Sequence, residues 1–72
     1  MVEGIKEAFD RASKKHGEFP ECKYKGLAII TEELGELSQS ILDGESSERQ
    51  KSEAIDIIIG CLRFIKKHYE MT

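Results

Sequence analysis

The sequence predicts an all-α protein, an antiparallel helical bundle of about three helices per chain that is completed by oligomerisation. Apolar residues recur at helical spacing along the 72 residues, and no segment alternates as a half-buried strand does. Gly17, Pro20 and Gly44 fall between the apolar segments, where helices end. Residues 1–72 form a single domain, which would bury only about 60% of its unfolded surface and be marginally stable as a monomer.

The first predicted helix runs from about Val2 to His16. Its apolar face has the i, i+3, i+4, i+7 spacing of a helix and consists of Ile5, Ala8, Phe9 and Ala12. Gly17 is a natural stop for this helix, and Pro20 disfavours its continuation. Residues 17–21 should therefore form a short loop, in which Phe19 is available to pack or to stack on a ligand.

The second predicted helix begins near residues 21–24 and ends at Asp43 and Gly44. Its apolar stripe consists of Leu27, Ile30, Leu34, Leu37 and Ile41. Ser47, with Gln50 three residues later, matches a capping box, so a third helix should start there and run to about Tyr69. The connection is short, which predicts that the second and third helices form an antiparallel pair.

The third predicted helix is apolar around most of its circumference, which indicates a buried helix. At about 100° per residue, one narrow stripe lies within about 60° of Asp56 and breaks this pattern. The stripe comprises Glu53, Asp56, Gly60, Arg63 and Lys67. Its acids therefore lie toward the N-terminal end of the helix and its bases toward the C-terminal end.

Two pairs of acids should meet between the second and third helices. Glu33 and Glu36 are three residues apart, as are Glu53 and Asp56, so each pair lies on one face of its helix. The pairs lie at similar distances before and after the turn, and hence at comparable depth in the hairpin. If the face of the second helix that bears the acids packs on the third, four carboxylates converge beside an apolar core, where unpaired charge is unfavourable.

Such a cluster is stable only if its acids are protonated or bind cations. Carboxylate oxygens suit Mg²⁺, with Mn²⁺ as an alternative, and the ligands would be Glu33, Glu36, Glu53 and Asp56. These four positions hold no Cys or His, which disfavours zinc and a di-iron centre. The competing interpretation is a solvated or ion-paired acidic face, because single acid pairs of this spacing are common on helix surfaces.

The segments 33–36 (ELGE) and 53–56 (EAID) resemble the ExxE…ExxD signature of the MazG-like all-α nucleotide pyrophosphohydrolases. The resemblance covers about residues 15–66. It implies Mg²⁺-dependent hydrolysis of a nucleoside triphosphate to the monophosphate and pyrophosphate, in the clearance of non-standard or excess nucleotides. It also implies that the four acids are metal ligands and that the chain assembles as a homodimer or homotetramer. Many members are longer and carry an N-terminal tryptophan, which this sequence lacks.

Further residues are candidates for the same site. Glu32, beside the four acids, completes the candidate catalytic set as a base or as a group that contacts a metal ligand, with a solvated acid as the alternative. Arg63 and Lys67 lie beyond the acids on the same stripe and should contact phosphate oxygens. The resemblance adds Lys15 and Phe19 as nucleotide contacts.

The composition limits the partners and the compartment. The net charge of −3 disfavours a nucleic acid polymer, and no apolar run is long enough to cross a membrane. Two cysteines and the absence of a signal-peptide pattern predict a cytoplasmic protein. Two other functions stay open: phosphoribosyl-ATP pyrophosphatase, in the same superfamily, and a non-catalytic helical assembly module whose acids are a remnant cation site.

Overall fold

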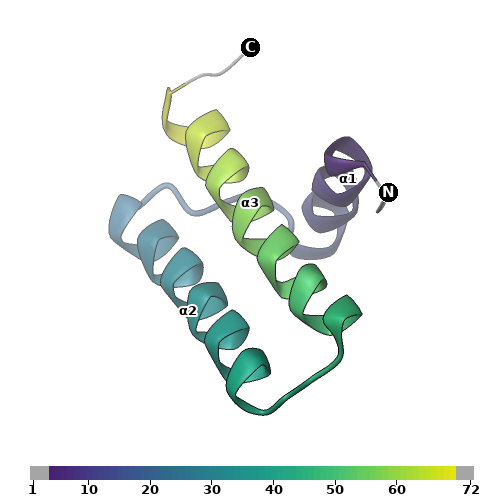
Figure 1. Ribbon diagram of the computed structural model, residues 1–72. Coiled ribbons are helices and arrows are strands. Elements are labelled where there is room, and N and C mark those ends of the chain that lie inside the picture. Colours follow the sequence, from purple (N-terminus) through teal and green to yellow (C-terminus); the bar gives the residue numbers. More distant parts are fainter. Residues whose placement is uncertain (1–3, 70–72) are drawn as a thin grey trace.

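The computed structural model describes residues 4–69, which form three helices and, within this range, no strand. The helices are α1 (Ile5–His16), α2 (Lys23–Leu42) and α3 (Ser47–Tyr69). The prediction of an all-α fold is confirmed. Helices α2 and α3 form an antiparallel hairpin, and α1 packs on α3 from the other side (Figure 1). Val2, the predicted start of the first helix, lies outside the described residues.

The helix ends follow the predicted turn residues, with one correction. Gly17 after α1 has a φ of 72°, and Gly44 between α2 and α3 has a φ of 68°, values that glycine adopts without steric cost. The predicted capping box at Ser47 is wrong by one residue. The hydroxyl of Ser46 accepts a hydrogen bond of 3.1 Å from the backbone N–H of Arg49, so Ser46 caps α3.

The face of α2 that packs on α3 coincides only in part with the predicted apolar stripe, of which Ile30 and Leu37 are half-buried. The buried residues of α2 are Gly26 and Ser40, which lie on the same face as the acids. The Ser40 hydroxyl donates to a backbone carbonyl one turn earlier and so keeps its partner in the interior. Three residues of the predicted stripe, Leu27, Leu34 and Ile41, are 57%, 55% and 54% exposed. Helix α2 therefore turns its small residues and Ile30 toward α3, whereas Leu27, Leu34 and Ile41 face outward.

The buried core lies between α1, the loop after it and α3. Ala8, Phe19 and Ile59 are its buried apolar side chains among the described residues. The Phe19 ring covers Gly26, where an added Cβ would come within 2.6 Å of a ring atom. The same ring meets Phe64 edge-on, with centroids 6.2 Å apart. Of the two roles expected for Phe19, the structure shows packing.

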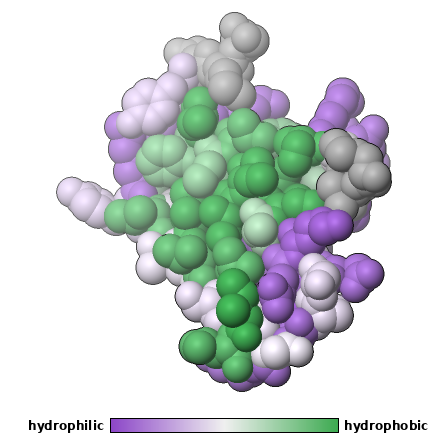
Figure 2. All heavy atoms as spheres, viewed as in Figure 1, coloured by the Kyte–Doolittle hydropathy of each residue, from purple (hydrophilic) through white to green (hydrophobic). Residues whose placement is uncertain are grey.

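An apolar surface extends over α2 and α3 on the side shown in Figure 2. We call this surface the apolar face, and its most exposed members are Leu27, Leu34, Ile41, Ile58 and Ile65. Its residues on α2 follow one another at intervals of seven, and so do its two residues on α3, which is the spacing of a seam between paired helices. Helix α3 is therefore not buried on all sides within one chain, because α1 and α2 leave this third side open.

Candidate metal centre

The four acids predicted as metal ligands lie along the contact between α2 and α3. Glu33 is half-buried, and its Oε1 lies 3.2 Å from the position that a Cβ on Gly60 would occupy. The missing side chain of Gly60 thus lets the Glu33 carboxylate approach the backbone of α3. The face of α2 that bears the acids does pack on α3, which was the condition for the carboxylates to converge.

Burial and mutual repulsion raise the pKa of Glu33 from 4.5 to about 7. Desolvation is the largest cause, because burial penalises the charged form. The negative charges of Asp56, Glu36 and Glu53 follow in that order, and Glu32 contributes least. The other three predicted ligands are therefore close enough to Glu33 to disfavour its ionisation.

Three cations surround Asp56 and partly offset this repulsion. Burial and the charge of Glu53 raise the pKa of Asp56, whereas the charges of Arg11, Arg49 and Lys15 act in the opposite direction. Of these three cations, only Lys15 was predicted from the sequence as part of the site. The sequence does contain a signal for Arg11 and Arg49. Arg49 precedes Glu53 by four residues, and Arg11 precedes Lys15 by four, so the two members of each pair lie on one face of their helix.

A cavity of about 430 Å³, which we call the acidic cavity, opens beside these groups. Three of the four predicted ligands and two of the cations line it, together with polar residues of α2, of α3 and of the turn between them: Glu36, Glu53, Asp56, Lys15, Arg49, Gln39, Ser40, Glu45 and Ser52. Glu53 is buried at its wall, and the Arg49 guanidinium forms an ion pair with the Glu53 carboxylate at 3.1 Å. Glu33 lies behind this wall, against α3.

The donor set of the acidic cavity suits a hard divalent cation, because it offers carboxylate oxygens and neither thiolate nor imidazole. In the conformation that the structure describes for residues 4–69, no three acids, histidines or cysteines are grouped closely enough to hold an ion. Glu53 is engaged by Arg49 instead. Binding of Mg²⁺ at these residues would thus require side-chain rotation and the release of Glu53 from Arg49.

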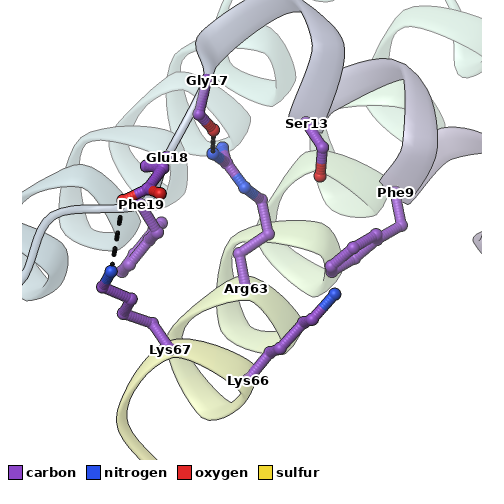
Figure 3. Close-up of a pocket in the computed structure, with 8 residues that line it drawn as sticks. All are labelled: Phe9, Ser13, Gly17, Glu18, Phe19, Arg63, Lys66 and Lys67. Carbon is purple, nitrogen blue, oxygen red and sulfur yellow. Dashed lines mark hydrogen bonds and ion pairs between the residues drawn. The ribbon is translucent and has the colours of Figure 1, made fainter.

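Three of the four predicted substrate contacts line a different cavity, of about 330 Å³, which we call the aromatic cavity (Figure 3). Arg63 donates a hydrogen bond to the backbone of the loop after α1, and Lys67 forms an ion pair with Glu18 at 3.3 Å. Phe19 contributes part of the wall. The structure separates these three residues from the acids, and only Lys15 borders the acidic cavity.

Glu32 is exposed on α2 and does not line the acidic cavity. It influences the site through its charge on Glu33. Among the described residues, Glu32 makes no direct contact with the other four acids. Its position therefore agrees better with a solvated acid than with a base inside the cavity.

The fold and the site together define a three-helix protein with an acidic cavity beside its α2–α3 contact. Comparison of the chain with known protein families, with characterised proteins and with solved structures finds no match. Within the described residues, no helix has the length and apolar character needed to span a membrane. The residues of the site are therefore the basis on which a function is inferred.

Proposed function

We propose that the protein is a Mg²⁺-dependent nucleoside triphosphate pyrophosphohydrolase, which converts a (d)NTP and water to the (d)NMP and pyrophosphate. The observation that carries this proposal is the raised pKa of Glu33 and of Asp56 beside two further acids in a helix contact. A carboxylate whose pKa is raised by burial and by neighbouring acids is typical of functional sites, and a bound cation relieves the repulsion. The spacing of the same four acids, ExxE…ExxD, supports the same reaction.

In this proposal Glu33, Glu36, Glu53 and Asp56 hold Mg²⁺, or Mn²⁺ in its place. The ion, when bound, neutralises phosphate charge and lowers the pKa of a bound water. Glu33 acts as a ligand in this proposal and not as the base, because a bound cation would lower the pKa that reaches about 7 without it. We assign Glu32, which is exposed, a weaker electrostatic role.

The cations of the acidic cavity would bind the phosphates of the substrate. Lys15 and Arg49 line the cavity together with the acids. Once the charge of the acids is neutralised, Arg49 gains little from its ion pair with Glu53 and can donate to phosphate oxygens instead. These two residues, rather than Arg63 and Lys67, are therefore the phosphate contacts that the geometry favours.

We further propose that two copies of the chain pair through the apolar face to complete a four-helix bundle. Five large apolar side chains of this face, Leu27, Leu34, Ile41, Ile58 and Ile65, are 37–57% exposed in a single chain. Pairing would remove them from water. The intervals of seven residues on both α2 and α3 suit a two-fold partner that presents the same helices.

One experiment tests the reaction. Purified protein is incubated with Mg²⁺ and a panel of (d)NTPs and phosphoribosyl-ATP, and the products are separated by ion-exchange chromatography. We expect monophosphate and pyrophosphate, with turnover reduced about 100-fold or more in Glu36→Gln and Asp56→Asn. Glu32→Gln, a neighbouring acid outside the cavity, is the matched control and should keep most of the activity.

Other results of this experiment would replace the proposal. Hydrolysis of phosphoribosyl-ATP alone would identify the related pyrophosphatase of that substrate. Absence of turnover in a fully assembled oligomer would identify a non-catalytic assembly module. The ion pair between Arg49 and Glu53 favours that second candidate, because it occupies a predicted ligand in the conformation described.

A further inference from the structure

The aromatic cavity is a second candidate binding site and shares no lining residue with the acidic cavity. It lies between the C-terminal turns of α1, the loop that follows and the C-terminal half of α3 (Figure 3). Its volume of about 330 Å³ is at the lower end of the range for small-molecule sites. A small ligand of defined chemistry would fit this space.

The charge of the aromatic cavity is opposite to that of the acidic cavity. Arg63, Lys66 and Lys67 line it, and Glu18 is the acid among its lining residues. Lys67 pairs with Glu18, whose side chain is 89% exposed. This ion pair is therefore weak, and an incoming anion can replace Glu18. Arg63 uses part of its guanidinium on the loop backbone and retains further N–H donors. The cavity therefore favours an anion.

Two aromatic rings give the same cavity an apolar wall. The Lys66 Nζ lies 5.5 Å from the centroid of the Phe9 ring, and the Arg63 Cζ lies 5.4 Å from the centroid of Phe19. Each ring thus orients a cation at the rim of the cavity. Flat ligands pack favourably against phenyl rings and guanidinium planes, so the cavity combines a surface for a planar group with donors for a phosphate.

The two cavities lie at different levels of α3 and have no lining residue in common. Asp56 lines the acidic cavity. Arg63, seven residues and about 10 Å further along α3, lines the aromatic cavity and donates a hydrogen bond to the loop after α1. The aromatic cavity therefore offers its contacts without any of the acids.

We propose that the aromatic cavity binds a nucleoside monophosphate, independently of Mg²⁺ and of the acidic cavity. The base packs against the ring of Phe9 and the guanidinium of Arg63, and the phosphate pairs with Lys66 and Lys67. This binding goes beyond the proposed hydrolysis and does not require it, because the ligand would bind equally to a protein without hydrolase activity. The monophosphate is also the product that the proposed reaction would release, which gives the site access to its ligand.

Calorimetry on the full chain in EDTA tests the proposal, with AMP, adenosine and inorganic phosphate as separate probes. We expect AMP to bind about tenfold or more tightly than either adenosine or inorganic phosphate, since neither part alone engages both the rings and the cations. Equal binding of AMP and inorganic phosphate would show an anion patch without a base site and overturn the proposal. Absence of AMP binding at millimolar concentration would overturn it too.

Variants locate the binding. Lys66→Glu reverses one charge at the rim of the cavity and should weaken AMP binding about tenfold or more, whereas Lys51→Glu, an exposed lysine of the same helix outside the cavity, should leave it unchanged. Phe9→Leu keeps an apolar side chain and should weaken binding of AMP but not of inorganic phosphate. Unaltered AMP affinity in a folded Lys66→Glu protein would contradict the assignment.

The outcome is distinguishable from that of the hydrolysis experiment. A chain that binds AMP in EDTA through Lys66 but hydrolyses no triphosphate would refute the proposed function and support this inference. A chain that hydrolyses triphosphates, yet binds AMP equally well with Lys66→Glu, would do the reverse. Circular dichroism spectra of each variant establish that the helices are intact.

Discussion

The carboxylate of Glu33 on α2 lies against the backbone of Gly60 on α3, with Oε1 3.2 Å from the place of an absent Cβ. This contact joins the fold to the site. The glycine permits the two helices to approach, and the approach removes water from the acid, which is the largest cause of its raised pKa. A substitution at Gly60 therefore acts on the packing and on the acid at once.

Gly60→Ala should leave stability nearly unchanged but weaken the response to Mg²⁺. Alanine gains about 0.5–1 kcal/mol in a helix interior, and displacement of Glu33 and of Ile30, whose Cγ1 would lie 3.4 Å from the new Cβ, offsets that gain. Gly35→Ala on α2 meets nothing within 4 Å and should stabilise the protein by up to about 1 kcal/mol. Urea unfolding of each variant with and without Mg²⁺ measures its stability and its response to Mg²⁺. Equal stabilisation by Gly60→Ala and Gly35→Ala would contradict the prediction.

Without metal, the stability of the protein should fall as the pH rises through neutrality. Because the pKa of Glu33 is about 7 in the folded state against 4.5 as the ordinary value, the folded state binds more protons between these values. The contribution of this group is complete below about pH 4.5 and is lost as the pH passes about 7. The raised pKa of Asp56 acts in the same direction.

Thermal unfolding in EDTA across this pH range is the measurement. Glu33→Gln removes the titrating group and should flatten the dependence, while Glu32→Gln, one residue away and exposed, should retain it. Added Mg²⁺ should stabilise the protein more at about pH 8 than at about pH 5, because ligands must be deprotonated to bind it. A Glu33→Gln protein with the slope of the original would refute the assignment to this group.

Arg49 should substitute for the ion in the metal-free protein. Its guanidinium pairs with the buried Glu53 at 3.1 Å, so Arg49→Met leaves that acid among like charges. Arg49 is itself well exposed, and we therefore expect a loss of only about 1 kcal/mol at pH 8. Mg²⁺ should recover more of the melting temperature in this variant than in the original. Lys51→Met, an exposed lysine nearby on α3, should show neither effect.

A charge in the apolar face should prevent self-association. Leu34 is 55% exposed at the middle of the α2 part of this face, and a glutamate there would be desolvated on pairing. Sedimentation equilibrium should give the mass of two chains for the original protein and of one for Leu34→Glu. Lys25→Gln, which lowers the net charge equally on the opposite side of α2, is the control. A monomeric original protein would exclude the proposed pairing.

The helices could be predicted from the sequence because their ends are local features. Gly17 and Gly44 stop α1 and α2 with positive φ values that few other residues adopt. The choice of the packed face of α2 could not be predicted in the same way. Periodicity selects the largest apolar residues, whereas close approach over Gly26 and Gly60 decided the contact and left Leu34 outside.

The position of the acid pairs along the α2–α3 contact followed from the sequence, but their cationic neighbours did not. Matched spacing on two antiparallel helices fixes the depth of Glu33 and Glu53 without any knowledge of α1. The path of α1 and of the loop after it is a tertiary property. That path brings Lys15 to the acids and carries the loop backbone to Arg63, which therefore lies in the aromatic cavity.

Among the described helices, α1 contacts α3 and not α2. A helix with so few neighbours can open locally at a lower free energy than global unfolding costs. In hydrogen exchange, the amides of α1 should therefore exchange before those at the α2–α3 contact. Because α1 carries Lys15 at the acidic cavity and Phe9 at the aromatic cavity, its release from α3 would open both cavities at once.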